Sequence, residues 1–191
     1  MSEKLVEEIK RGNEAAYRKL IAEYQDMVIS TCYGLVQNKE DAEDIAQEVF
    51  VKVYQSINQF RKDSKLSSWI YRIAVNQSLN TLRKNRIKKC WIKLEEAFSD
   101  HYAGTHRQET GPYYQPHKRM ESNEGMRLIR KAIRELPTNQ RTALVLHKYE
   151  GRPHDEIAEI MKTSHSSVES LIFRAKKNIR KKLVRYYKGS I

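Results

Sequence analysis

The sequence has few of the residues that interrupt helices or mark turns. Only 7 glycines and 4 prolines occur among its 191 residues, and almost no stretch alternates apolar and polar residues as a half-buried strand does. Apolar residues instead recur at intervals of three and four, which is the spacing of one helix face. The sequence therefore predicts an all-α protein.

Cysteine is also scarce. Cys32 and Cys90 are the only two cysteines, and they lack the spacing of zinc-binding pairs. Cys32 lies in an apolar helical pattern, which indicates a buried thiol. This sparing use of cysteine favours a reducing, intracellular setting.

Long apolar runs are missing as well. No stretch approaches the roughly twenty apolar residues that a membrane-spanning helix needs. Residues 1–12 do not contain the apolar core of a signal peptide. We therefore expect a cytoplasmic protein that does not insert into membranes.

The proportions of apolar and charged residues bear on domain organisation. Hydrophobic residues make up 39% of the chain and charged residues 31%, which suits two small helical domains better than one large core. We expect a first domain at residues 3–92, a flexible linker at 93–122 and a second domain at 123–191.

The positive charge is concentrated in two blocks. The chain has a net charge of +12. Residues 61–90 hold nine Lys and Arg against one Asp, and residues 151–191 hold ten against four acidic residues. Two separate basic blocks indicate a polyanion that is bound at two places. A membrane surface is the competing polyanion, but no aromatic-rich apolar face accompanies these charges.

Residues 38–57 form the pattern of an amphipathic helix. Asn38 can cap it, with Asp41 three residues further on. Its apolar residues are Ala42, Ile45, Ala46, Val49, Phe50, Val53 and Ile57. The opposite face carries Asp41, Asp44, Gln47, Glu48, Lys52 and Gln55. Such a polar face is usually only solvated.

A second helix follows the polar loop at residues 61–66, and Ser67 or Ser68 can cap it. Trp69 at its start is better explained as a core residue than as a stacking platform. Arg72, Asn76, Asn80 and Arg83 recur every three or four residues and share one face. Amides that can read base edges, beside cations that can hold phosphates, indicate a nucleic-acid interface.

Two motifs in these helices resemble a known family. Residues 41–50 (DAEDIAQEVF) and 69–76 (WIYRIAVN) resemble the signatures of domain 2 of bacterial sigma factors, most closely the extracytoplasmic-function (ECF) group. The resemblance implies docking on the β′ clamp helices of core RNA polymerase through Asp41, Asp44, Gln47, Glu48 and Gln55. It implies recognition and melting of the promoter −10 element through Lys65, Arg72, Asn76, Asn80, Arg83 and Lys84.

The expected linker shows neither helical nor strand periodicity. Its histidines, His101, His106 and His117, do not have the spacing of a zinc site, and no cysteine or acidic residue pairs with them. We therefore predict no metal site and no cofactor.

Helical periodicity returns from Asn123, and Pro137 ends the first of these helices, with Thr138 as a possible cap for the next. Residues 155–172 have the pattern of a helix-turn-helix. Lys162 stands in the turn where glycine is favoured, so a positive φ is expected there. Glu169 can accept a hydrogen bond from cytosine.

Residues 136–183 resemble domain 4 of the same family. The resemblance implies that this domain holds the polymerase β flap and reads the −35 element. The residues that would face DNA are Ser166, Ser167, Ser170, Phe173, Arg174 and Lys177.

The sequence thus predicts a dissociable sigma factor whose partners are core RNA polymerase, promoter DNA and an anti-sigma protein. A helix-turn-helix regulator that acts without replacing the sigma subunit is the alternative, but it leaves the motif at residues 69–76 unexplained. An enzyme is not expected, because the carboxylates of Glu43, Asp44 and Glu48 lie on an exposed helix face, without a nucleophile or phosphate-binding loop nearby.

Overall fold

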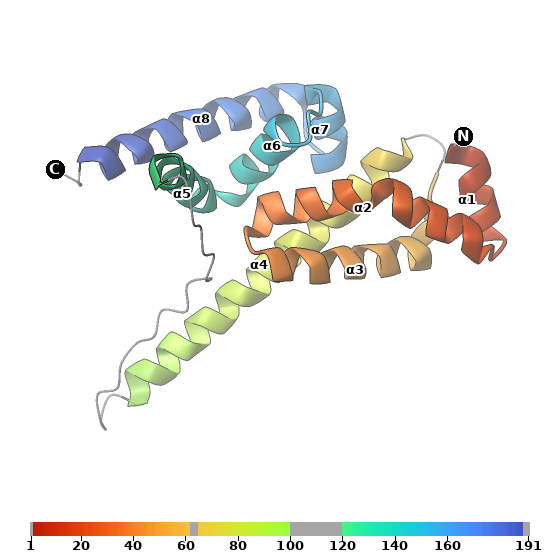
Figure 1. The fold of residues 1–191 in the computed structure, drawn as a ribbon, viewed down its shortest axis with the longest axis horizontal. Coiled ribbons are helices and arrows are strands. Elements are labelled where there is room, and N and C mark those ends of the chain that lie inside the picture. Colours follow the sequence, from red (N-terminus) through yellow and green to blue (C-terminus); the bar gives the residue numbers. More distant parts are fainter. Residues whose placement is uncertain (1, 62–64, 100–119, 189–191) are drawn as a thin grey trace.

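The computed structural model describes residues 2–61, 65–99 and 120–188. Over these ranges the chain folds into helices and contains no strand, which confirms the all-α prediction (Figure 1). The elements are α1 (Ser2–Lys10), α2 (Glu14–Val36), α3 (Lys39–Ser56), the 3-10 turn η1 (Ile57–Gln59), α4 (Leu66–Ser99), α5 (Met120–Arg134), α6 (Thr138–Lys148), α7 (His154–Met161) and α8 (His165–Lys188).

Two asparagines set the starts of the helices of the first domain. The Asn13 side chain accepts hydrogen bonds from the backbone N–H groups of Ala15 and Ala16 at 3.0 and 3.2 Å. The Asn38 side chain accepts one from Asp41 N–H at 3.0 Å. Both caps satisfy N–H groups that have no partner within the helix, and the Asn38 cap was predicted.

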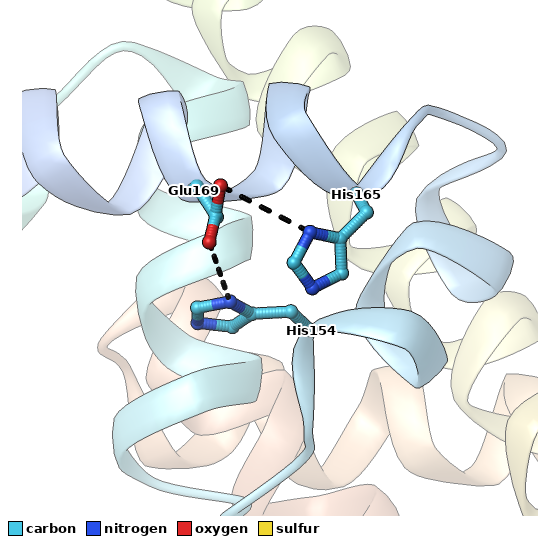
Figure 2. A group of neighbouring side chains, drawn as sticks. All are labelled: His154, His165 and Glu169. Atoms are coloured by element: carbon cyan, nitrogen blue, oxygen red, sulfur yellow. Dashed lines mark ion pairs between the residues drawn. The ribbon is translucent and has the colours of Figure 1, made fainter.

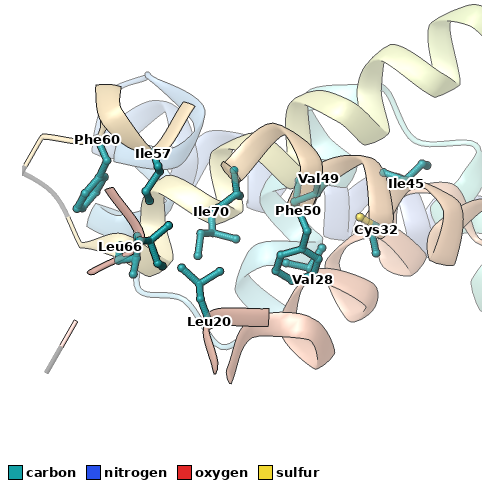
Figure 3. Close-up of a cluster of buried hydrophobic side chains, with 14 of the residues drawn as sticks. Leu20, Val28, Cys32, Ile45, Val49, Phe50, Ile57, Phe60, Leu66 and Ile70 are labelled. Atoms are coloured by element: carbon teal, nitrogen blue, oxygen red, sulfur yellow. The ribbon is translucent and has the colours of Figure 1, made fainter. Parts of the chain in front are cut away.

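The first domain is built on a hairpin of α2 and α3, with α4 packed across it and α1 closing one end (Figure 1). Its core contains Leu20, Val28, Val49 and Ile70, which are buried together (Figure 3). Trp69 packs on this core, with its ring 5.3 Å from that of Phe60. Trp69 is thus half-buried against the core, which agrees with the packing role expected for it and not with a free stacking platform.

Helix α4 differs from the expectation at both ends. It begins at Leu66, so Ser67 and Ser68 lie inside the helix and do not cap it. The reason is that Leu66 is buried in the core, which draws the preceding residue, Lys65, into the position where its C=O accepts from Trp69 N–H. At its other end α4 continues to Ser99, past the expected start of the linker.

In the second domain α5, α6 and α7 pack along α8. Helix α5 begins at Met120, before the expected start of this domain at residue 123. The cap position of α6 is Pro137, so Thr138 is the first residue of the helix and not its cap. Lys162 ends α7 with a φ of 52°, the positive value expected for the helix-turn-helix turn. The histidines expected in the linker, His101, His106 and His117, lie outside the described residues.

No helix among the described residues is long and apolar enough to cross a lipid bilayer.

We predict that the two thiols differ sharply in reactivity. Cys32 is fully buried, and burial raises the pKa of its thiol from 9.0 to about 11, whereas Cys90 is exposed. Since the thiolate is the reactive form, a disulfide reagent at neutral pH should label Cys90 quickly and Cys32 only as the domain unfolds. The Cys90→Ser variant is the control and should show no fast phase. Equal labelling rates in the native protein would contradict the buried position of Cys32.

Candidate nucleic-acid and protein interfaces

The polar face of α3 borders a shallow groove of about 530 Å³. Four of the five residues predicted to dock on polymerase line it, whereas Asp41 does not. Val51 contributes an apolar side chain that is 56% exposed, and Gln77 contributes from α4. The residues that line the groove are Asp44, Gln47, Glu48, Val51, Lys52, Gln55 and Gln77. The face is therefore a concave surface of carboxylates and amides with one lysine and one exposed apolar side chain.

The face predicted to read the −10 element lies along α4. Asn76, Asn80, Arg83 and Lys84 are exposed. Arg72 is not free, because its side chain is only 26% exposed and contacts Glu159 of α7. Its guanidinium donates to the Glu159 carbonyl oxygen at 3.1 Å and lies 3.7 Å from the carboxylate.

Two more residues of this face meet the second domain. Lys65 forms an ion pair with Glu156 of α7. Asn76 lines a crevice of about 280 Å³ between α4 and the helices α6 and α7, across from Asn139 and Lys162. Asn76 is thus exposed beside the second domain, on the wall of this crevice.

The predicted −35 face lies at the start of α8. Ser166, Ser170, Arg174 and Lys177 are exposed, and Phe173 is 68% exposed. Ser167 is half-buried, and its backbone N–H donates to Ser164 Oγ at 3.2 Å. The helix cap is thus Ser164, a role that the sequence analysis did not assign.

The two domains pack against each other, which the sequence analysis did not predict. Leu35, Tyr71 and Val75 of the first domain form one buried cluster with residues of the second, among them Val145 and Ile157. Helix α2 approaches α6 closely at Gly34, where an added Cβ would lie 2.7 Å from a methyl group of Val145. Only glycine allows this approach.

A buried arginine connects the backbones of the two domains. Arg141 of α6 donates to the Leu35 carbonyl oxygen of α2 at 2.9 Å. It also donates to the carbonyl oxygens of Arg134 and Leu136, at 2.5 and 3.5 Å. Burial lowers the pKa of Arg141, and the charge of nearby Arg134 lowers it further.

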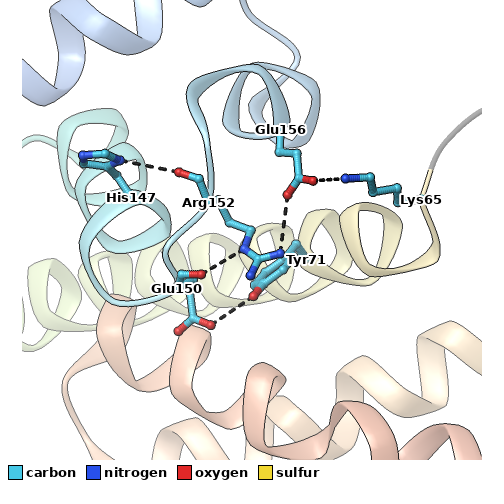
Figure 4. A network of polar contacts seen from close by, with 6 residues as sticks. All are labelled: Lys65, Tyr71, His147, Glu150, Arg152 and Glu156. Atoms are coloured by element: carbon cyan, nitrogen blue, oxygen red, sulfur yellow. Dashed lines mark hydrogen bonds and ion pairs between the residues drawn. The ribbon is translucent and has the colours of Figure 1, made fainter.

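A network of polar contacts also joins the two domains, through Tyr71, Glu150, Arg152, Glu156 and Lys65 (Figure 4). The Tyr71 hydroxyl donates to Glu150 at 3.1 Å, and Ser30 of α2 donates to the other carboxylate oxygen at 2.7 Å. The Arg152 guanidinium lies 5.5 Å from the centre of the Tyr71 ring. Burial, followed by the charge of Glu150, raises the pKa of Tyr71 well above its usual value of 10.0, so the phenol stays a donor at neutral pH.

Sequence reasoning missed the roles of Arg141, Glu150 and Tyr71 because each contacts a partner far away in the chain. The motif that contains Tyr71 indicates a helix face, not a contact with the second domain. Among these interface residues, Gly34 is the one whose close contact with another helix the sequence could have indicated. A glycine inside a long helix costs about 1 kcal/mol relative to alanine, and a close approach is the usual compensation.

Comparison with known families agrees with both helical domains. A family model described as Sigma-70 region 2 matches residues 20–87, and one described as Sigma-70, region 4 matches residues 126–179. The RNA polymerase sigma-H factor of Pseudomonas aeruginosa is 33% identical over 183 residues, which cover 95% of this chain and 93% of that protein. The ECF RNA polymerase sigma-E factor of Haemophilus influenzae is 35% identical over 181 residues, or 94% and 93% of the two chains.

Two solved structures share the overall fold. CnrH, solved in complex with the cytosolic domain of CnrY, has a TM-score of 0.66 at 20% identity, with 95% of this chain and 96% of that chain covered. The sigma factor RpoE of Bartonella quintana, solved in complex with the anti-sigma factor NepR, has a TM-score of 0.60 at 19% identity, with 87% and 96% covered.

We predict that Gly34→Ala separates the two domains without unfolding either one. The substitution favours helix α2 by about 1 kcal/mol, but the new methyl group overlaps Val145, and such overpacking costs about 1–3 kcal/mol. Small-angle X-ray scattering should therefore show a larger radius of gyration at unchanged helix content.

The matched control is Gly125→Ala in α5, where the added Cβ would meet only the Tyr187 hydroxyl, at 3.9 Å. This variant should remain as compact as the parent protein. An equally compact Gly34→Ala variant would mean that Val145 yields and that the domain contact does not depend on the glycine.

Proposed function

This chain belongs to the ECF group of bacterial RNA polymerase sigma factors, and we propose that it binds core polymerase through its α3 groove and reads −10 and −35 elements through α4 and α8. The observation that carries the proposal is the pairing of two exposed basic faces, on separate helical domains, with one acidic-polar groove. The partners imply work in the bacterial cytoplasm, by binding and not by catalysis.

The polymerase contact is assigned to the groove because of its chemistry. Asp44 and Glu48 supply negative charge, Gln47 and Gln55 supply amides, and Val51 supplies an exposed apolar side chain. A polar rim around an apolar centre is the usual anatomy of a protein interface. Asp41 does not line the groove, so its contact with polymerase would lie at the rim of the interface.

The −10 contact is divided between amides and cations. Asn76 and Asn80 can each donate and accept on one base edge, which single-stranded bases leave open. Arg83 and Lys84, further along α4, are placed to hold phosphates, and Lys65 and Arg72 extend the basic face toward the start of the helix. On α8, Arg174 and Lys177 would contact the −35 element beside Ser166, Ser167, Ser170 and Phe173.

The packed arrangement of the domains is, in this proposal, a resting form. Arg72 cannot hold Glu159 and DNA at once, and Asn76 faces the crevice between the domains. The contact around Arg72 is imperfect, since Arg72 Nε and Glu159 Oε1 are buried without a hydrogen-bond partner. Unmet groups of this kind weaken an interface, so the contact is suited to release.

An anti-sigma protein is the proposed regulator. The similar structures of CnrH and RpoE were solved with regulatory chains, described as the cytosolic domain of CnrY and the anti-sigma factor NepR. A protein that bound both domains of this chain would hold them together and keep Arg72 and Asn76 away from promoter DNA.

Runoff transcription tests the proposal as a whole. The protein, added to core RNA polymerase and genomic fragments of its source, should start transcripts at defined positions that core enzyme alone does not use. A helix-turn-helix regulator would not program bare core enzyme, so the absence of new start sites would overturn the assignment.

We predict that reversing two groove charges weakens polymerase binding. The Asp44→Lys/Glu48→Lys variant should lose about tenfold or more in affinity for core enzyme at moderate salt, because charges at an interface rim steer association. Glu43→Lys is the matched control, since Glu43 lies on the same helix, outside the groove lining and paired with Lys39 at 3.7 Å. Helix content should be unchanged in both. Equal affinities for the two variants would place the docking surface elsewhere.

We predict different losses from two residues of the −10 face. Asn76→Ala should change which −10 sequences are opened and leave the salt dependence nearly intact, because an amide carries no charge. Arg83→Ala should weaken all promoters alike and lower the salt slope by about one phosphate contact.

The measurement is open-complex formation on a panel of −10 variants across a salt series. If Asn76→Ala weakens every promoter equally, Asn76 has a structural role and the base contact must be reassigned.

A further inference from the structure

A group of three side chains joins the first turns of α7 and α8 (Figure 2). His154 opens α7, His165 opens α8, and Glu169 follows one turn into α8. One donor atom from each of the three lies within 4.8 Å of the others. The sequence analysis weighed only the linker histidines as metal ligands and gave these residues no such role.

The carboxylate lies between the two imidazole rings without bonding to either. His154 Nδ1 is 3.9 Å from Glu169 Oε1, and His165 Nδ1 is 3.9 Å from Glu169 Oε2. These distances are too long for hydrogen bonds. Zinc bonds of about 2.0–2.2 Å set the donors of a tetrahedral site about 3.4 Å apart, so modest rotation of these side chains would enclose an ion.

The side chains around the group support a metal site. Asp155 Oδ1 is 3.8 Å from His165 Nε2, the nitrogen that faces away from Glu169. A carboxylate on the far nitrogen of a ligand histidine is the common way in which proteins orient such a ring. On the other side, the His147 ring lies 5.0 Å from the His154 ring, which in turn lies 5.4 Å from that of His165.

We propose that His154, His165 and Glu169 bind one Zn²⁺ ion, with Asp155 orienting His165. Two imidazoles and one carboxylate suit zinc-type transition ions and not Mg²⁺ or Ca²⁺, which take oxygen ligands. Three protein ligands leave a coordination position open to water. His154, whose side chain is 29% exposed, would be the innermost ligand, and Glu169, at 57%, the outermost.

The ion would connect the two helices of the helix-turn-helix at their N-terminal ends. It would also replace the single negative charge of Glu169, next to Ser166 and Ser170 on the −35 face, with a net positive charge. Zinc should therefore stabilise the second domain and favour binding of an anionic ligand at that face. The second consequence rests on the proposed function, whereas ion binding does not.

Calorimetric titration of the metal-free, full-length protein with Zn²⁺ tests the site. The Cys90→Ser background removes an exposed thiol that could also bind the ion. We expect the background protein to bind one Zn²⁺ ion per chain. The His165→Ala and Glu169→Ala variants should each bind Zn²⁺ more than about 100-fold more weakly. That loss exceeds the 10–100-fold expected for Asp155→Asn, which removes only the orienting carboxylate.

Two controls separate this site from other histidines. The controls are His147→Ala and His117→Gln. His147 lies next to the group but supplies none of its three donors, and His117 belongs to the expected linker. Both variants should bind Zn²⁺ with the affinity of the background protein. Each variant's melting temperature without metal should match that of the background, and zinc should raise it only where the three ligands are intact.

Full zinc affinity in His165→Ala and Glu169→Ala would overturn the proposal, as would the absence of binding at micromolar zinc. Tighter binding of Ni²⁺ or Co²⁺ through the same three residues would overturn the choice of zinc and support the site. A final titration of −35 DNA, with and without Zn²⁺, tests the coupling. Zinc binding without a change in DNA affinity would uphold the site and refute its effect on promoter recognition.

Discussion

The buried guanidinium of Arg141 is the contact on which the arrangement of the two domains depends. It donates to three backbone carbonyl oxygens, one at the end of α2 and two at the end of α5 and the turn after it. Carbonyl groups at helix ends have no partner within the helix. One side chain therefore satisfies carbonyl groups at helix ends from both domains. These hydrogen bonds offset part of the cost of burying its charge, while Arg141 Nε is buried without a hydrogen-bond partner.

The rest of the interface is organised around that contact. Gly34 lets α2 approach Val145 one residue before the carbonyl that Arg141 binds. On the α4 side, Tyr71 and Glu150 complete a polar network that also reaches Ser30 of α2. Apolar burial brings the domains together, and the directional hydrogen bonds determine which surfaces meet.

This packing gives several residues two possible partners. Arg72 is bound to Glu159, and Lys65 to Glu156, although both cations are proposed here to contact promoter DNA. Both acidic residues lie on α7, the first helix of the helix-turn-helix. The second domain thus presents carboxylates to the cations of the first, much as DNA would present phosphates, and the two interactions exclude each other.

The sequence by itself determined the elements and their exposed faces. Helix α3 with its Asn38 cap, the buried Cys32 and the positive φ of Lys162 all follow from spacing and residue type within one or two turns. These features were predictable because helix formation and capping depend on neighbours in the chain. The exceptions are instructive: Ser67, Ser68 and Thr138 are good capping residues, yet the burial of Leu66 and the position of Pro137 placed the helix starts elsewhere.

Only the tertiary structure decided how the two domains meet and which side chains gather there. Arg141 and Leu35 are 106 positions apart, Lys65 and Glu156 are 91 apart, and His154 approaches Glu169 only because two helices fold back on each other. No local period records such pairs, since each depends on the final positions of several helices at once. The sequence thus predicts the faces proposed to bind DNA and polymerase, whereas packing between residues far apart in the chain decides whether those faces are open or covered.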